Sequence, residues 1–144
     1  MPNKALRILI ADEQHFHRMK IERGLNQLGY YRIAPVHSLE ELLIVVEYGC
    51  EPFDLVILNA NLTTSGGLDP LGLCQDNLQI RHALIYDAEQ AGLPALYAVA
   101  QRKVRLHQAR LPDQETLESL MRRVDTPIPM SERGHGWPRD SLRA

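Results

Sequence analysis

Hydrophobic and polar residues alternate along this chain in blocks that predict strands followed by helices. Near-continuous apolar runs are typical of strands buried on both faces of a parallel sheet. Such runs occur at 5–12, 53–59 and 82–87. A shorter run at 31–36 includes Pro35, which predicts an edge strand because proline cannot donate to a sheet ladder. A fifth strand is expected at 103–109, where basic residues interrupt the apolar pattern.

Between these runs, apolar residues recur at the spacing of a helix. Helices are predicted at 13–30, 38–49, 69–79, 93–102 and 113–124. Ser38 and Glu41 form a capping-box pattern, and Asp69-Pro70 has the N-cap and first-turn residues of a helix start. Gly29 is expected just after the end of the first helix. A glycine-bearing loop is expected at 63–67.

Repeated strand–helix units predict the fold class. Five of them indicate an α/β, flavodoxin-like (βα)5 fold, with a doubly wound parallel five-stranded sheet in a single domain. We place this domain at 1–124. The segment 125–144 has three prolines, two glycines and no periodicity, so we expect a flexible C-terminal tail or linker. It is either the natural end of the protein or the start of a connection to an output domain.

Composition narrows the class of protein. The chain has 144 residues, 44% hydrophobic and 24% charged, as in an ordinary globular domain. Its net charge of −2 does not favour direct binding to nucleic acid or to an anionic membrane. Cys50 and Cys74 lack metal or redox spacing, and the apolar run at 6–11 is too short for a signal sequence or a membrane span. We therefore expect a cytoplasmic protein.

Polar side chains follow the predicted strands where the strands end. Parallel strands bring their carboxyl ends to one edge, so a common site is expected there. Its candidates are Asp12, Glu13, Asn59, Tyr86 and Asp87. Four of these residues have a structural alternative: the acidic pair as helix caps, Asn59 as an anchor for the next loop, and Tyr86 as a core residue with a satisfied hydroxyl.

Two histidines stand beside this acidic pair. His15 and His17 are two residues apart on a predicted helix, so they point to different sides and are not expected to form a metal pair.

These motifs, in this order, resemble the response-regulator receiver domain over 5–124. Asp12-Glu13 matches the acidic pair that binds magnesium in that family, and "DLVILNANL" matches its third strand and following loop. Asn61 then corresponds to the residue whose backbone carbonyl is a metal ligand, and Gly67 to a small residue of the loop.

Four positions depart from the receiver pattern. Asn59 replaces the phospho-acceptor aspartate, Tyr86 in "ALIYDA" replaces a Ser or Thr, and Leu111 in "ARLPD" replaces a lysine. Gln108 replaces the switch aromatic. An amide is not a useful nucleophile, and leucine cannot pair with a phosphoryl group. The resemblance therefore implies a degenerate receiver.

This resemblance implies a function in a bacterial two-component system. We expect an atypical receiver that is no enzyme and acts by phosphorylation-independent binding to a protein partner or effector. No cofactor is expected beyond weak Mg²⁺ binding at Asp12, Glu13 and Asn61. The alternative is a flavodoxin-like module that binds a small ligand at the ends of the strands, or a remnant of an enzyme. Its only candidate phosphate cradle is "TTSGG" (63–67), which no basic anchor follows.

The resemblance also implies a partner surface around the fourth helix, fifth strand and last helix. Its residues are Tyr97, Arg102, Arg105, Arg110, Glu118, Arg122 and Arg123. The mixture of charge signs suits a homodimer or a contact with another protein. The alternative is that the basic residues only solvate and protect an edge strand.

Overall fold

A single parallel sheet organises the protein. The computed structural model describes residues 3–88, 103–107 and 111–125, and all structural statements below concern these residues. The strands are β1 (Ile8–Ala11), β2 (Ile33–Val36), β3 (Leu55–Asn59), β4 (Ala83–Tyr86) and β5 (Val104–Leu106). Their order is β2-β1-β3-β4-β5, all neighbours are parallel, and β2 is an edge strand. The predicted flavodoxin-like fold is confirmed, including the edge position of the proline-containing strand.

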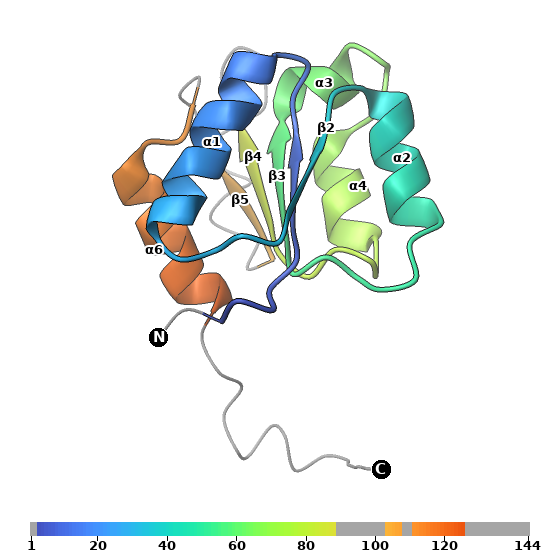
Figure 1. Ribbon diagram of the computed structural model, residues 1–144. Coiled ribbons are helices and arrows are strands. Elements are labelled where there is room, and N and C mark those ends of the chain that lie inside the picture. The colour runs from blue at the N-terminus through green and yellow to red at the C-terminus, as the bar shows by residue number, and fades with distance from the viewer. Residues whose placement is uncertain (1–2, 89–102, 108–110, 126–144) are drawn as a thin grey trace, which may run out of the picture.

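Helices cover both faces of the sheet (Figure 1). The described helices are α1 (His15–Gln27), α2 (Leu39–Glu47), α3 (Ala60–Thr64), α4 (Pro70–Asp76) and α6 (Gln114–Val124). α1 and α6 lie on one face, α2 and α4 lie on the other, and α3 directly follows β3. The helix predicted at 93–102 lies outside the described residues.

Side-chain caps explain where three helices start. The Ser38 hydroxyl accepts from the Glu41 N–H at 3.1 Å before α2. Asp69 accepts from two N–H groups of α4, and Asp113 accepts from the Thr116 N–H at 2.8 Å before α6. These bonds satisfy N–H groups that lack a partner within the helix. The predicted starts at Ser38 and Asp69 are thereby confirmed, as is Gly29, which follows α1 with φ +99°.

The segment after β3 differs from the prediction. A loop was expected at 63–67, but α3 already includes Thr63 and Thr64. The Asn59 side chain caps this short helix by accepting from the Asn61 N–H. Threonine hydroxyls also donate to the Ala60 carbonyl within the helix. Local hydrogen bonding therefore overrides the turn-like composition of this segment.

The core has one layer on each face of the sheet. Alternate residues of β1 divide between them: Ile8 and Ile10 pack toward α1 and α6, whereas Leu9 and Ala11 pack toward α2 and α4. All four β1 side chains are fully buried, as expected for a central strand covered by helices on both sides. This packing holds the carboxyl ends of β1, β3 and β4 side by side.

α6 closes against α1 at Gly24. A Cβ at this position would lie 2.6 Å from Leu117 Cδ1, so only glycine permits this approach without rearrangement. Gln114 Nε2 donates to the Gly24 carbonyl at 3.0 Å. At the other end of α6, the Asp125 carboxylate accepts from the Tyr30 hydroxyl at 2.6 Å.

The rest of the predicted tail, 126–144, lies outside the described residues. None of the described helices is long and apolar enough to cross a membrane.

Candidate functional site at the carboxyl ends of the strands

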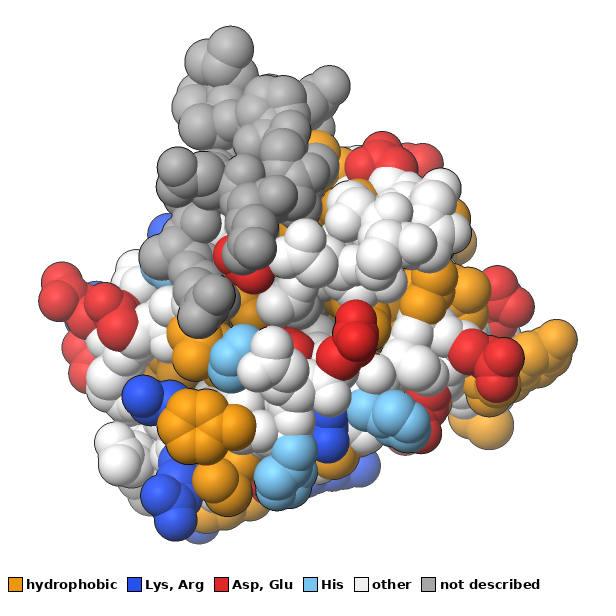
Figure 2. Space-filling model, turned by 90° about the horizontal axis from the view of Figure 1, so that it is seen from above, with side chains coloured by type: hydrophobic (Ala, Val, Ile, Leu, Met, Phe, Trp, Pro, Cys, Tyr) orange, Lys and Arg blue, Asp and Glu red, His pale blue; other side chains and the backbone are white. Residues whose placement is uncertain are grey.

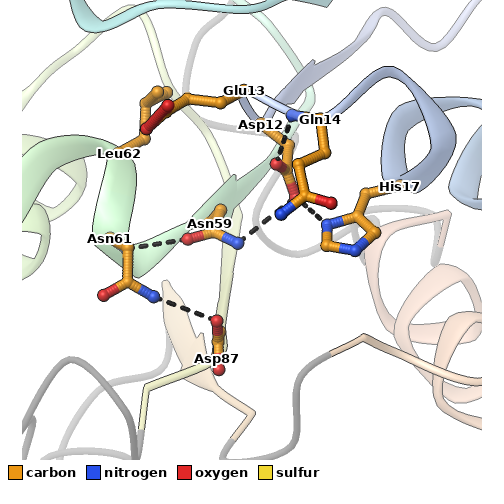
Figure 3. Close-up of a pocket in the computed structure, with 8 residues that line it drawn as sticks. All are labelled: Asp12, Glu13, Gln14, His17, Asn59, Asn61, Leu62 and Asp87. Atoms are coloured by element: carbon orange, nitrogen blue, oxygen red, sulfur yellow. Dashed lines mark hydrogen bonds and ion pairs between the residues drawn. The ribbon is translucent and has the colours of Figure 1, made fainter.

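A polar pocket of about 190 Å³ lies where β1 and β3 end. This is the switch point of the sheet order, where open α/β folds bind ligands. Its lining combines carboxylates, amides and a histidine from several segments (Figure 3). The lining residues are Asp12, Glu13, Gln14, His17, Asn59, Asn61, Leu62 and Asp87.

The Asp12 carboxylate accepts hydrogen bonds from four donors. Its Oδ2 accepts from His17 Nδ1 at 3.0 Å, Asn59 Nδ2 at 3.2 Å and the Tyr86 hydroxyl at 2.5 Å. Its Oδ1 accepts from the Gln14 N–H at 2.9 Å. Asp12 is only 2% exposed, so these four donors replace the water that an ionised carboxylate needs. Because a carboxylate only accepts, His17 Nδ1 carries the hydrogen in this contact.

Asn59 joins two parts of the site through its amide. Its Oδ1 accepts from the Asn61 N–H at 2.8 Å, while its Nδ2 donates to Asp12. This amide is 7% exposed and needs both a donor and an acceptor in fixed places. The interpretation of Asn59 as the anchor of the following segment is confirmed. An aspartate here would lose the donor and place a second negative charge against Asp12.

Tyr86 is a core residue with a satisfied hydroxyl, as the structural alternative predicted. Its side chain is fully buried, and its hydroxyl donates to Asp12. Burial, followed by the hydrogen bond to the Asp12 carboxylate, raises the pKa of this hydroxyl well above its ordinary value. The hydroxyl therefore remains a donor over the whole range of pH in which proteins normally work.

Asp87 and Asn61 form the opposite wall of the pocket. Asn61 Nδ2 donates to Asp87 Oδ2 at 2.9 Å. Asp87 is 8% exposed and has φ +58°, a left-handed conformation that costs a non-glycine residue about 1–2 kcal/mol. Strained backbone is often retained at functional sites, which makes this wall a candidate for ligand contact.

The predicted metal ligands do not converge. Figure 3 shows the Glu13 side chain extending toward Leu62, away from the Asp12 carboxylate. The Asn61 carbonyl accepts from the Ser65 N–H at 3.1 Å, because this segment is helical. Within the described residues, no group of three or more His, Cys, Asp or Glu side chains is placed to hold a metal ion. Weak Mg²⁺ binding stays a prediction.

The remaining predicted residues lie away from the pocket or outside the described residues. Leu111 is half-buried and packs against the α1–α6 side of the core, and its carbonyl accepts from His107 Nε2 at 3.2 Å. Arg105 lies on β5, and Arg122 pairs with Glu118 at 3.7 Å on α6, which also holds Arg123. Positions outside the described residues are Tyr97, Arg102, Gln108 and Arg110.

His17 is the site residue that the sequence interpretation missed. Its side chain is 8% exposed and contacts Asp12 directly. A signal was present, because His17 precedes the buried Ile21 and Leu25 at helical spacing and so lies on the buried side of α1. Sequence reasoning considered this histidine only as half of a metal pair with His15.

Fold and pocket define a flavodoxin-like α/β domain with a polar site at its switch point, and comparison with known proteins supports the fold. No family model matches the chain, and no curated protein matches it either. Among solved structures, the chain is similar to the solution structure of SdrG from Sphingomonas melonis Fr1, with a TM-score of 0.61 and 17% identity. The match covers 85% of this chain and 98% of that one. At this identity the likeness shows the fold alone.

Proposed function

We propose that this chain is an atypical receiver domain of a two-component response regulator, which signals by binding a protein rather than by accepting a phosphoryl group. The observation that carries the proposal is the contact between Asn59 and Asp12. At the position of a receiver's nucleophile, an amide donates to the acidic residue that would otherwise help to hold magnesium. The flavodoxin-like fold supports the same assignment.

The chemistry of the pocket argues against phosphoryl transfer. An amide is neutral and does not form an acyl phosphate under mild conditions. Donors occupy the Asp12 carboxylate, so a cation would have to displace hydrogen bonds before binding. Leu111 is an apolar packing residue where a receiver has a lysine. We therefore propose that the domain is no enzyme and binds Mg²⁺ weakly at most.

A receiver without phosphorylation can still signal through a fixed surface. A partner that binds one conformation regulates the pathway by its own abundance or affinity, and needs no covalent switch. The proposed surface, here named the β5–α6 surface, combines Arg105 with Glu118, Arg122 and Arg123 of α6. Tyr97, Arg102 and Arg110, which the sequence adds to it, lie outside the described residues. A protein effector or a second copy of the chain is the proposed partner.

Reversing one charge on the β5–α6 surface tests this function. Arg105→Glu in the full chain should abolish partner capture in a pull-down, or self-association in sedimentation, and Lys4→Glu serves as the matched control. Arg105 is half-buried and Lys4 is exposed, so the unfolding midpoint of Arg105→Glu is measured as well, and a loss of binding counts only if the variant is folded as the wild type is. If Arg105→Glu binds normally while Asn59→Asp alters binding, the pocket is the working site instead.

The alternative of a flavodoxin-like small-ligand module has less support. Its candidate phosphate cradle includes Thr63 and Thr64, whose hydroxyls both donate to the Ala60 carbonyl at 3.1 Å. These hydroxyls are therefore used within α3 rather than presented to a ligand. A phosphate ligand would have to break these two hydrogen bonds before it could use the hydroxyls, so we favour the protein-binding function.

A further inference from the structure

Acidic residues are segregated into one part of the chain. Between Arg32 and Arg81 there is no lysine or arginine, but there are seven acidic residues. This stretch forms β2, α2, β3, α3 and α4. Among the described helices, α2 and α4 therefore carry acidic side chains without basic ones, although the net charge of the whole chain is only −2. The seven residues are Glu40, Glu41, Glu47, Glu51, Asp54, Asp69 and Asp76.

Large apolar side chains are exposed on this acidic part. Ile44 is 53% exposed, and Tyr48, one helical turn later at the end of α2, is 78% exposed. Leu78, in the turn after α4, is 92% exposed. Gln79 Nε2 donates to the Gly49 carbonyl at 3.3 Å, which ties this turn to the end of α2. We name these three apolar residues the α2 patch.

Exposed carboxylates flank the α2 patch. Glu40 and Glu47 lie on α2 about one turn before Ile44 and just before Tyr48, and Glu51 follows in the next loop. No ion pair involves these three among the described residues. The space-filling view in Figure 2 shows hydrophobic side chains projecting beside acidic ones at the right of the molecule.

The basic side chains that reach this end of the molecule are already engaged. Arg7 donates to the Glu51 carbonyl at 2.7 Å and lies over the Phe53 ring. Lys103 Nζ donates to the Asn77 carbonyl at 2.9 Å, and Arg81 lies 3.9 Å from Asp54. Within the described residues, none of these cations forms an ion pair with Glu40, Glu47 or Glu51.

We propose that the α2 patch docks a basic amphipathic helix of a protein partner. Ile44 and Tyr48, spaced by one turn, match the apolar stripe of such a helix, and its lysines or arginines match the flanking glutamates. Charge complementarity sets register and speeds association, while the central aromatic residue contributes most of the affinity. The inference is independent of the proposed function, because it uses neither the pocket nor the β5–α6 surface.

A synthetic peptide tests this docking surface in the full chain. The probe is a labelled helical peptide with leucines on one face and lysines on the other, measured by fluorescence anisotropy. Tyr48→Ser should weaken binding about tenfold, as expected for a central aromatic anchor. The double change Glu40→Lys and Glu47→Lys should weaken it similarly. All three positions are exposed, so the unfolding midpoint should remain near that of the wild type.

Three controls separate docking from general charge attraction. Lys20→Glu with Arg23→Glu, on α1, should leave peptide binding within about twofold, and so should Arg105→Glu, which tests the proposed function separately. A peptide of the same composition with a scrambled pattern should bind weakly. The proposal is overturned if Tyr48→Ser binds like the wild type, if the scrambled peptide binds equally well, or if the patch instead mediates Tyr48-dependent self-association.

Discussion

Two buried aspartates face the same pocket, yet their surroundings differ. Asp12 is 2% exposed, and four donors fill its carboxylate. Asp87 is 8% exposed, accepts from the side-chain amide of Asn61 and lies on left-handed backbone. The first is held by a network that joins β1, α1, β3 and β4. The second belongs to the wall beside α3.

This difference gives the two aspartates different roles in one site: Asp12 stabilises the fold, whereas Asp87 is the candidate for ligand contact. A buried carboxylate with four partners stabilises the fold as long as every partner is present, and it has little capacity left for a ligand. Among the described residues, Asp87 has a single side-chain donor and lies on strained backbone, so it is the aspartate with more capacity left for a ligand. Asn59 determines the division, because its amide supplies a donor to Asp12. Substitutions at four positions test the comparison.

The largest effect is expected from Asp12→Ala. It leaves the buried donors of His17, Asn59 and Tyr86 without an acceptor, which should lower the free energy of unfolding by about 3 kcal/mol or more. Asp12→Asn keeps one acceptor oxygen and should lose less, so it serves if the alanine variant does not fold. Chemical denaturation monitored by circular dichroism measures both. A loss below about 1 kcal/mol for Asp12→Ala would mean that the network contributes little.

Asn59→Asp should be the next most damaging change. It removes a donor to Asp12 and adds a like charge, so a loss of about 2–3 kcal/mol is expected at neutral pH. The pKa of one carboxyl of this pair should rise in the folded state, so the loss should be small near about pH 4 and grow toward about pH 7.

Magnesium gives the same variant a second readout. Two adjacent carboxylates attract a hard cation, so millimolar Mg²⁺ should raise the unfolding midpoint of Asn59→Asp and leave that of the wild type nearly unchanged. Equal stabilisation of both proteins would show that the wild-type pocket already binds the metal.

Tyr86→Phe should have a moderate effect that depends on pH. Loss of the hydroxyl donor to Asp12 is expected to cost about 1–2 kcal/mol near neutral pH. The raised pKa of Tyr86 means that its contribution is present below about pH 10 and is lost as the pH rises above that value. The variant should therefore lose less stability than the wild type between about pH 9 and pH 11. Tyr30, whose pKa is also raised, is still present in the Tyr86→Phe variant. The free energy of unfolding of the variant should therefore still fall as the pH rises, but by less than that of the wild type.

The smallest effect is expected from Asp87→Asn. Asparagine tolerates left-handed backbone and can still accept from Asn61, so stability should change by less than about 0.5 kcal/mol. Thermal unfolding beside the Asp12→Asn variant makes the comparison direct. A loss at Asp87 as large as that at Asp12 would remove the distinction between the two aspartates.

Much of this architecture follows from local sequence signals. Apolar runs predicted the strands, and polar residues at their ends predicted which side chains share the rim. The helix caps at Ser38 and Asp69 were also readable, since each combines a cap residue with a matching first turn. Each of these features depends on residues that are close together in the chain, so it can be predicted from one sequence.

Other parts of the site depend on contacts between distant segments. The pairing of His17 with Asp12 requires the phase of α1 relative to β1, and the capping role of Asn59 turns an expected loop into α3. The bond between Asn61 and Asp87 requires the left-handed backbone of Asp87. A non-glycine residue in that conformation has no reliable sequence signal.

The most direct test of the account is intact-mass measurement of the wild-type chain after incubation with acetyl phosphate and Mg²⁺. A receiver domain that has its acceptor aspartate, treated in parallel, shows that the donor is active. We predict no added phosphoryl mass on this chain, because β3 ends in the neutral amide of Asn59, which donates to Asp12, rather than in a carboxylate. A stable phosphoryl adduct mapped to Asp12, Glu13 or Asp87 would contradict it.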